Sequence, residues 1–276
     1  MSTIDTAKTA SLIAAASAAR IYDLGHGLEA STPVSPNHPP FRMALMRRHG
    51  DRMREDGGSG ANEMLSLGCH TGTHIDALCH VSHEGHLYGG VDAAEASHGG
   101  RFNVYGAETI APFVCRGVLL DVPRALGMET LEAAHATTAE ELEATARAQG
   151  VEVRAGDAVL IRSGWPARHW NDAEAFIGWK SGVPGPDASA GRWLAEREIR
   201  VAGADTIAFE WLAPGAGHSR LPAHITLIVE HGIHILEVLD LEQLARDRVY
   251  EFLFVCSPLK LVGATGSPVR PLAVVA

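Results

Sequence analysis

Histidine is the residue type that stands out in this sequence. Five of the 15 histidines lie within residues 69–86, at positions 70, 74, 80, 83 and 86. Asp76 lies among them, so imidazole and carboxylate groups are concentrated in one short stretch. Both groups are common ligands of catalytic metal ions. The stretch is therefore the strongest candidate for a metal-dependent active centre.

The spacing of these residues restricts the backbone that can bring them together. In an extended strand His70 and His74 would lie about 13 Å apart, at ~3.3 Å per residue, which is too far for one ion. A helix would bring them together, as in the HExxH proteases. However, the residues between them are Thr-Gly-Thr, which form helices poorly, and the catalytic glutamate is missing. The remaining possibility is that the chain bends at Gly72, so that the side chains of His70, His74 and Asp76 come together.

Two imidazoles and one carboxylate leave coordination positions open, as a catalytic metal requires. Ligands of this kind suit zinc, manganese or iron. His80 is too far along the bent segment to be an obvious fourth ligand, and histidine titrates in the range needed for proton transfer, so we assign it that role. Two alternatives stay open: His80 binds or orients the metal, or the whole segment is a turn with hydrogen-bonded histidines.

Three downstream residues are further candidates. His224 is expected on a helix, and Glu237 on a strand with apolar neighbours, where a carboxylate needs a partner. Together they are candidates to hold a second ion or to orient the ligands of the first, although each alone is equally compatible with a surface position. Trp211, beside Glu210 in a stretch rich in proline and glycine, is a candidate pocket wall for a planar substrate, with core packing as the alternative.

Composition excludes several classes of protein. A chain of 276 residues with 46% hydrophobic residues buries roughly 75% of its unfolded surface in one core. The net charge of −10 has the wrong sign for binding nucleic acid or an anionic membrane. The run Leu12 to Ala19 is too short to span a bilayer, so residues 1–20 are predicted as a helical arm. Four cysteines without a CxxC pair indicate a reduced, cytoplasmic protein.

The second half of the chain alternates predicted helices and strands. A capping box of Thr138 and Glu141 opens one helix and Gly150 ends it. Helices are expected over 138–149, 187–198, 222–231 and 241–246, and strands over 151–153, 158–162, 199–204, 233–238, 249–256 and 269–275. This alternation predicts one α/β domain with a mixed sheet over residues 21–276. The glycine-rich loops 57–60 and 178–186 are candidates to border a pocket.

At its histidine segment the sequence resembles the cyclase family of metal-dependent hydrolases, which includes bacterial kynurenine formamidase and isatin hydrolase. The family signature is His-x-Gly-Thr-His-x-Asp-x-Pro-x-His. It is matched by His70, Gly72, Thr73, His74, Asp76 and His80, with Leu78 in place of the proline. The resemblance extends from residues 23–26 through 203–206 and 222–224 to 258–263. Leu78 and the length of the chain favour the isatin-hydrolase-like side of the family.

The resemblance implies the family's swivelling β/β/α architecture, usually in homodimers or homotetramers. It implies one divalent ion, Mn or Zn, with a second ion possible. The residues that match the family's positions are His70, His74 and Asp76 for the metal, His80 for catalysis, and His224 and Glu237 for a second metal or for orienting the first. His26, in the opening segment of the resemblance, is a candidate to contact substrate.

These expectations combine into one predicted reaction and several alternatives. The predicted reaction is hydrolysis of an amide, either a cyclic amide or an N-formyl arylamine, by metal-activated water. The substrate is then a small molecule, aromatic or cyclic. Alternatives are a lactone hydrolase or a cyclase or dehydratase of the same family, a mononuclear iron oxygenase, and a metal-binding protein without turnover. The oxygenase normally requires an all-β double-sheet barrel, against which the capped helices argue.

Overall fold

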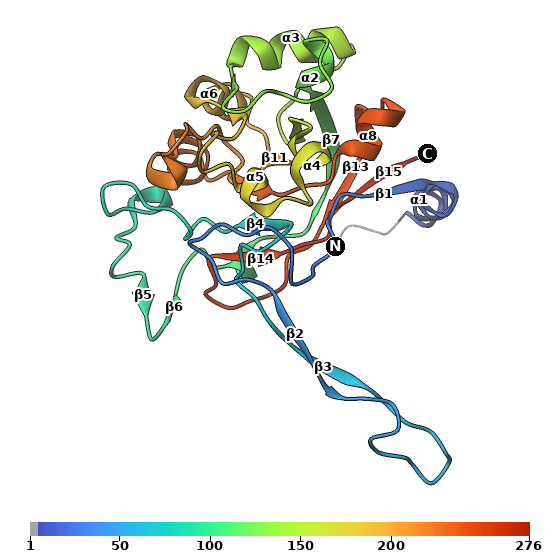
Figure 1. The fold of residues 1–276 in the computed structure, drawn as a ribbon. Coiled ribbons are helices and arrows are strands. Elements are labelled where there is room, and N and C mark those ends of the chain that lie inside the picture. Colours follow the sequence, from blue (N-terminus) through green and yellow to red (C-terminus); the bar gives the residue numbers. More distant parts are fainter. Residues whose placement is uncertain (1–4) are drawn as a thin grey trace.

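A large mixed sheet forms the centre of the molecule, which we describe over residues 5–276 in a computed structural model (Figure 1). Within these residues nine strands form this sheet. Their order is β1 (Arg20–Asp23), β15 (Leu272–Val275), β13 (Glu251–Cys256), β7 (Phe113–Asp121), β9 (Ala158–Arg162), β11 (Val201–Ala204), β12 (His234–Glu237), β4 (His74–Asp76) and β14 (Gly266–Pro268). The four strands β7, β9, β11 and β12 are parallel, and the other neighbours are antiparallel. The predicted α/β class with a mixed sheet in a single domain is confirmed, and it is not the all-β barrel of the oxygenase alternative.

Both faces of the parallel strands are buried, which explains why β9 is apolar along its length. Leu160 packs into the hydrophobic cluster on one face, and Val159 and Ile161 pack into the cluster on the other. The second face is covered by α3 (Ala139–Gln149), α6 (Ala188–Glu196) and the helical segment of α7 (Pro222–His224) and the π-helix η4 (Ile225–Glu230). Figure 1 shows α3 and α6 together on this side. The first face is covered in part by α8 (Glu242–Asp247).

The local helix signals operate as predicted. Thr138 Oγ1 accepts a hydrogen bond from the Glu141 amide, while Glu141 Oε2 accepts one from the Thr138 amide. Gly150 ends α3 with a left-handed φ of 69°. Asp187 caps α6 by accepting hydrogen bonds from the amides of Ser189 and Ala190. Each signal is made by residues within a few positions of one another, so the sequence alone suffices to locate it.

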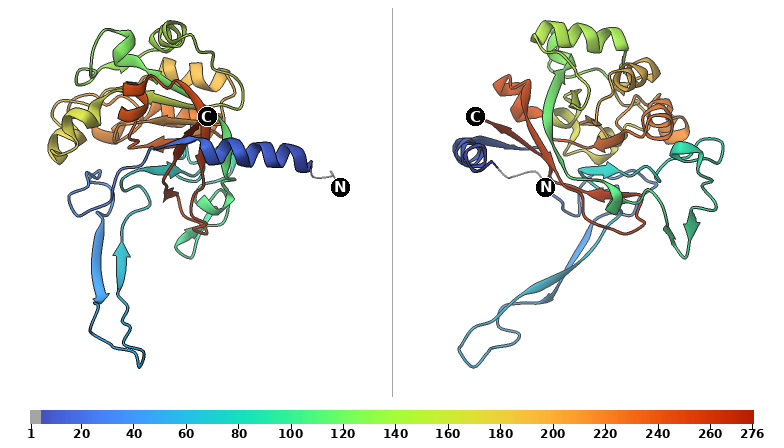
Figure 2. Two further views of the ribbon diagram at one scale, coloured as in Figure 1. Left: turned by 90° about the vertical axis from the view of Figure 1, so that its right-hand side faces the viewer. Right: turned by 180° about the vertical axis from the view of Figure 1, so that it is seen from behind.

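Two predictions about local structure are wrong, and a third, the helix over 222–231, is confirmed with a different helix type. Residues 151–153 are not a strand, because the amide of Val151 donates to Ala146 O at the end of α3 and the Glu152 carbonyl accepts from Arg116, which leaves little backbone for strand pairing. The segment 222–231 is helical, but most of it is the π-helix η4 rather than an α-helix. The 57–60 loop lies at the free end of a projecting hairpin, away from the body of the molecule (Figures 1 and 2).

That hairpin pairs β2 (Arg42–Arg47) with β3 (Asn62–Ser66), and its side chains are exposed on both faces. At the edge of the sheet, α1 (Thr6–Ala18) precedes β1 and buries none of its residues (Figure 2). The first four residues of the predicted arm lie outside the described residues. Within residues 5–276 no helix combines the length and apolarity needed to cross a membrane. The four cysteines are free thiols.

Short elements complete the chain between these larger ones. They are η1 (Tyr88–Gly90), β5 (Ser97–His98), β6 (Arg101–Phe102), η2 (Ala107–Thr109), α2 (Val122–Ala125), β8 (Ala136–Thr137), α4 (Trp165–His169), α5 (Ala173–Ile177), β10 (Gly185–Pro186) and η3 (Gly217–Ser219). Strands β8 and β10 pair in parallel, and β5 and β6 pair antiparallel. The parallel strands β7, β9 and β12 end in charged residues, Asp121, Arg162 and Glu237, so their carboxyl edge is where buried polar chemistry gathers.

Candidate metal centre

The histidine segment leads into β4, which lies between β12 and β14. In the antiparallel register His74 is opposite Glu237 of β12, and Asp76 is opposite Gly266 of β14. A Cβ atom at Gly266 would lie 2.7 Å from the ring of His70, so only glycine leaves room for that ring. The sheet register therefore brings a carboxylate from the distant β12 beside the histidines and clears the space they occupy.

Gly72 produces the bend that the spacing of the histidines requires. Its φ is 66°, in the left-handed region that favours glycine, so the conformation of the turn requires glycine at this position. The turn is fixed by its neighbours: Thr73 Oγ1 donates to Val238 O at 2.6 Å, and His74 Nδ1 donates to Gly72 O at 2.7 Å. The predicted bend at Gly72 is confirmed.

His70, His74 and Asp76 converge as the first set of potential ligands. One ligand atom from each lies within 4.8 Å of the others, and all three side chains are buried. His70 Nδ1 lies 2.8 Å from Asp76 Oδ1, and His74 Nε2 lies 3.7 Å from the same oxygen. These distances place two imidazole nitrogens and one carboxylate around a single point.

A second set shares Asp76 with the first and adds His224 and Glu237. His224 Nε2 lies 3.7 Å from Asp76 Oδ2 and 3.2 Å from Glu237 Oε1. The other oxygen of Glu237 lies 3.4 Å from His74 Nε2. The structure therefore brings the upstream and downstream candidates into one cluster, with Asp76 between the two sets.

Each ring in the cluster has one nitrogen directed inward and the other engaged by an outer partner. His70 Nε2 pairs with Thr265 Oγ1 at 2.9 Å, and His224 Nδ1 pairs with Glu210 Oε1 at 2.7 Å. The Nδ1 atom of His74 donates to a carbonyl, as described above, so it carries the hydrogen. Outer partners of this kind fix ring orientation and tautomer at metal sites. The inward atoms are therefore His70 Nδ1, His74 Nε2 and His224 Nε2.

Unsatisfied buried atoms test whether this cluster fits a metal ion. Among residues 5–276, His70 Nδ1 and both oxygens of Asp76 are buried without a hydrogen-bond partner. His70 Nδ1 and Asp76 Oδ1 are close, but not in hydrogen-bonding geometry. Orphaned buried polar atoms are costly unless a further group satisfies them. Imidazole nitrogens and carboxylate oxygens that point at one another are the donors a divalent ion takes, so the cluster fits such an ion.

The electrostatics of the cluster favour ionised carboxylates. Burial raises the pKa of Asp76, but the surrounding histidines, above all His80 and His70, lower it well below its usual value. Burial likewise raises the pKa of Glu237, whereas its hydrogen bonds, first that with His224, lower it to about 2. Burial lowers the pKa of His224, but hydrogen bonds with two carboxylates raise it to about 10. Asp76 and Glu237 are therefore ionised in the buried centre, and they hold a proton on His224 that a bound cation would displace.

Comparison with known proteins places the chain in a family. The profile of the family described as Putative cyclase matches residues 22–211, more than half of the chain. The chain belongs to this cyclase family. Kynurenine formamidase from Geobacillus thermodenitrificans is 27% identical over 248 residues, covering 90% of this chain and 94% of that protein.

Solved structures agree with the cyclase-family assignment. A crystal structure described as a novel cyclase has a TM-score of 0.83 at 26% identity, covering 98% of this chain and 93% of that one. Isatin hydrolase A from Ralstonia solanacearum has a TM-score of 0.73 at 28% identity, covering 100% of this chain and 98% of that one. The fold of this cyclase-family chain is thus shared along essentially its whole length.

His80 lies beside the cluster and in neither ligand set. Its ring stacks on that of His70 with centroids 4.0 Å apart and an interplanar angle of 26°. Burial lowers the pKa of His80 to about 4, against the opposing charge of Asp76. His80 is thus adjacent to a potential ligand without contributing an atom to either set.

Three further residues near the cluster have no sequence motif that would reveal them. His38 stacks on His70 with ring centroids 4.9 Å apart, and burial lowers its pKa to about 4. Burial also lowers the pKa of His218, which the charges of Glu237 and His224 influence as well. Glu210, noted in the sequence only as the neighbour of Trp211, holds the outer side of His224. His38 and Glu210 lie in loops and His218 lies in the short 3₁₀-helix η3, where periodicity gives no signal.

The two predicted substrate contacts lie farther out. His26 stacks on Trp170 with ring centroids 3.8 Å apart and lines a cavity of about 340 Å³ that also includes Thr73. That cavity contains none of the potential metal ligands. Trp211 follows the buried Glu210, but its indole nitrogen donates to Ala134 O at 2.7 Å. Neither side chain belongs to the cluster itself.

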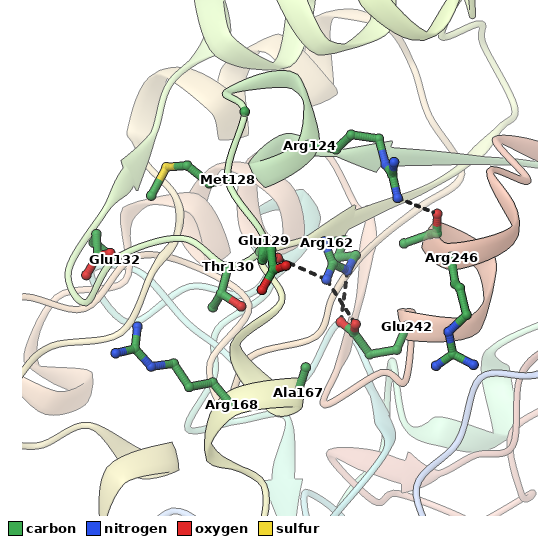
Figure 3. A pocket seen from close by; sticks show the side chains of 12 residues that line it. Arg124, Met128, Glu129, Thr130, Glu132, Arg162, Ala167, Arg168, Glu242 and Arg246 are labelled. Atoms are coloured by element: carbon green, nitrogen blue, oxygen red, sulfur yellow. Dashed lines mark hydrogen bonds and ion pairs between the residues drawn. The ribbon is translucent and has the colours of Figure 1, made fainter.

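A larger cavity of about 1000 Å³ lies away from the cluster, near the ends of β7 and β9 (Figure 3). Arginines and glutamates line much of it. Arg162, buried at its base, donates to both oxygens of Glu242 and to Glu129 O. Arg124 donates to Ala245 O. The cavity contains no histidine and neither ligand set, so it offers no comparable metal chemistry.

Proposed function

We propose that this cyclase-family protein is a metal-dependent hydrolase that cleaves the carbon–nitrogen bond of an amide, either a cyclic amide or an N-formyl arylamine. The observation that carries the proposal is the convergence of three imidazoles and two buried carboxylates in one cluster. The similar proteins named kynurenine formamidase and isatin hydrolase support a hydrolytic reaction.

In this proposal His70, His74 and Asp76 hold one divalent ion, Mn²⁺ or Zn²⁺. His224 and Glu237 either hold a second ion or orient the ligands of the first. A divalent ion bound in such a site lowers the pKa of water to about 7 and polarises a carbonyl group. The chain contributes the fixed ring orientations and the buried carboxylates, so that the ligands need little rearrangement when the ion binds.

His80 carries the proton in this proposal. An amide nitrogen is a poor leaving group unless it is protonated, so hydrolysis needs an acid beside the carbonyl. The His80 ring lies against His70, one of the proposed ligands, and belongs to neither ligand set. Because its pKa is lowered to about 4, His80 is neutral at pH 7, so in this proposal it takes up the proton that the attacking water loses and then delivers it to the departing nitrogen.

The proposed substrate is small and cyclic or aromatic. The ring of His38, stacked on His70, supplies a flat face next to the cluster. Trp211 and His26 stay candidates for substrate contacts at a greater distance. Isatin, the compound in the name of one similar structure, is a cyclic amide of suitable shape and is the first substrate to test.

A substrate panel tests the reaction class. Isatin and other cyclic amides, N-formyl arylamines and lactones are incubated with the enzyme, and acid release is followed with a pH indicator. We expect turnover of at least one amide, its loss after chelation, and its return with manganese or zinc. Turnover of lactones alone would redirect the proposal to ester chemistry, and metal retention without any hydrolysis would indicate a metal-binding protein.

The number of ions is a separate measurement. We expect elemental analysis to find close to one tightly held equivalent per chain, with Glu237→Gln weakening activity without halving the metal content. Asp76 has two carboxylate oxygens and can bridge ions about 3.5–4 Å apart. Two equivalents in the wild type, falling to one in Glu237→Gln, would establish a two-metal site.

We also propose that the protein is a homodimer or homotetramer. The β2–β3 hairpin exposes Met43, Leu45, Met46, Met64 and Leu65, each more than half accessible. A two-stranded hairpin without a packing partner is marginally stable in water, so contact between copies of the chain would stabilise it. Light scattering that gives the monomer mass at micromolar concentration would reject this part of the proposal.

A further inference from the structure

We infer that Glu210 positions His224 for metal binding by holding the ring hydrogen on Nδ1, so that Nε2 faces the ion. This inference rests on the proposed metal-dependent function and concerns the second ligand set, which would take a weaker ion at saturating Zn²⁺ beside the one tightly held equivalent. It assigns a role to a residue outside both ligand sets. Glu210 lies on the outer side of the His224 ring, opposite the cluster.

The hydrogen bonds of the Glu210 carboxylate all go to two neighbouring residues, Ala223 and His224. Its Oε2 accepts from the Ala223 amide at 3.0 Å, and its Oε1 accepts from the His224 amide at 2.9 Å. The same Oε1 pairs with His224 Nδ1 at 2.7 Å. Glu210 is 1% exposed, and no lysine or arginine in the described chain pairs with it. A buried carboxylate whose three partners are N–H groups around one imidazole fixes both the position and the orientation of that ring.

The backbone on both sides of the ring is held in an uncommon conformation. Phe209, directly before Glu210, has a φ of 56°, and Val238, directly after Glu237, also has a φ of 56°. A non-glycine residue in this region is strained and persists only where the surroundings enforce it. Here Thr206 ties the two turns together, since its Oγ1 donates to Phe209 O and its carbonyl accepts from the Val238 amide. The carboxylates on the two sides of His224 are thus held in fixed positions.

The consequence is a defined tautomer. A carboxylate at Nδ1 only accepts, so the hydrogen stays on Nδ1, and an ion that binds this ring would displace the proton on Nε2 and take its lone pair. Nε2 points toward Asp76 and Glu237, where a ligand is required. At His70 the outer partner is the Thr265 hydroxyl, which both donates and accepts and so leaves the tautomer open. Of these two rings, only His224 has a tautomer set by a charged outer partner.

Glu210→Gln tests the inference because it keeps the size and changes the acceptors. The glutamine amide has one accepting oxygen and one NH₂ group, and the site presents three N–H donors. The NH₂ group must therefore either face one of the backbone N–H donors, which leaves that donor without an acceptor, or donate to Nδ1. The second arrangement places the ring hydrogen on Nε2, where it blocks metal binding. Loss of an outer partner of this kind costs about 10–100-fold in metal affinity. We expect a loss of that size in calorimetric titrations of the metal-free protein with Zn²⁺.

Asp187→Asn is the matched control. Asp187 also holds the amides at the start of a helix, those of Ser189 and Ala190, but it contacts no imidazole. Both variants weaken a helix start, so thermal melts measure the shared structural effect. Only Glu210→Gln should lower the affinity for Zn²⁺. Equal Zn²⁺ affinities for the two variants would overturn the inference while leaving the hydrolase proposal intact.

A direct measurement on the wild type covers the case in which Glu210→Gln does not fold. Ring ¹⁵N spectra of the protein saturated with Zn²⁺, so that the second ligand set is also filled, distinguish a protonated nitrogen from a metal-bound one, and His224→Gln assigns the signals. We expect a protonated Nδ1 and a metal-bound Nε2 at His224. A metal-bound Nδ1 would overturn the inference about Glu210. Wild-type protein that binds no Zn²⁺, Mn²⁺ or Fe²⁺ would overturn the proposed function, and this inference with it.

Discussion

Two clusters of buried charge lie at the carboxyl edge of the sheet, and they differ in how the charge is balanced. In the first, at the ends of β7 and β9, Arg162 donates to Asp121 at 2.8 Å and to both oxygens of Glu242 at 2.8 and 2.9 Å. Arg124 donates to the other oxygen of Asp121 at 2.9 Å. Two guanidinium groups thus face two carboxylates, and each carboxylate has a partner for both of its oxygens.

The second cluster, at the end of β12, has no such balance. Within the described chain Asp76 and Glu237 pair with histidines and with no lysine or arginine. Both oxygens of Asp76 lack a hydrogen-bond partner. The comparison indicates that the arginine cluster is complete without a ligand, whereas the histidine cluster needs a cation from outside the chain. A buried charge therefore does not by itself indicate a functional site. Buried carboxylates that lack a lysine or arginine partner do.

Removing the carboxylate of Asp76, which both ligand sets share, should have the largest effect on bound metal and on hydrolysis. Because Asp76 belongs to both ligand sets, we expect Asp76→Asn to lose bound metal and to reduce hydrolysis to the uncatalysed rate, as chelation does in the wild type. Elemental analysis and the acid-release assay measure the two effects. Asp121→Asn removes an equally buried carboxylate from the arginine cluster and should keep its metal. Loss of metal in both variants would contradict the conclusion that only the histidine cluster binds the ion.

His80→Ala should have the next largest effect. If His80 transfers a proton and does not bind the ion, kcat falls by roughly 10²–10⁴-fold while metal content stays at the wild-type level. Steady-state kinetics and elemental analysis on the same preparation give both values. His83→Ala, an exposed histidine three residues later, serves as the control and should change kcat less than twofold. A fall in metal content in His80→Ala would reassign His80 as a ligand.

The arginine cluster should respond in stability and not in chemistry. Arg162→Met leaves Asp121 and Glu242 without their main partner, and breaking a buried ion pair costs about 3–5 kcal/mol. We expect a loss of that size in the free energy of unfolding measured with urea, with an unchanged metal equivalent in the folded protein. A loss below 1 kcal/mol would mean that water or Arg124 replaces the guanidinium, and the cluster would not be the structural unit described here.

Local signals explain how much of the fold was predictable. The capping box of Thr138, the left-handed Gly150 and the bend at Gly72 each depend on residues a few positions apart, and each is found where expected. The absent strand at 151–153 and the π-helix η4 depend on contacts with other segments, such as Arg116 at the Glu152 carbonyl. Short apolar runs do not reveal whether a partner strand exists.

The same division applies to the candidate site. The segment from His70 to Asp76 carries its chemistry in a local pattern, so the sequence alone identifies it. Glu237 joins through the register of β4 and β12, which the sequence indicates only as a strand. His38 and Glu210 reach the cluster through loops whose paths are set by tertiary packing. Residues that meet only through long-range packing show no characteristic spacing in the sequence. Residues that hold the outer side of a ligand, such as Glu210, therefore cannot be found from the sequence alone.

Asp205 lies next to the arginine cluster and should give the smallest effect, visible as a dependence of stability on pH. Burial raises its pKa to about 6, although hydrogen bonds from Ser163 and the charge of Arg162 oppose the shift. The unfolded value is 3.8, so the folded state favours the protonated acid. The resulting stabilisation is fully present below pH 3.8 and is lost as the pH rises through 6. At 1.36 kcal/mol per pKa unit the loss is about 3 kcal/mol.

Asp205→Asn reports this loss, because asparagine is a neutral replacement of similar size at every pH. In metal-free protein, the unfolding free energy of wild type minus that of Asp205→Asn should fall by about 2 kcal/mol between pH 4 and pH 7.5, because part of the loss has already occurred at pH 4. Asp23→Asn supplies the opposite sign: the hydrogen bond from Arg270 lowers the pKa of Asp23, so its small contribution is present above pH 3.8 and lost as the pH falls. If the Asp205 difference instead grew with pH, the amides of Ser163 and Gly164 would be stabilising an ionised carboxylate. The edge of the sheet would then hold a third carboxylate charge, besides Asp121 and Glu242, for the arginine cluster to balance.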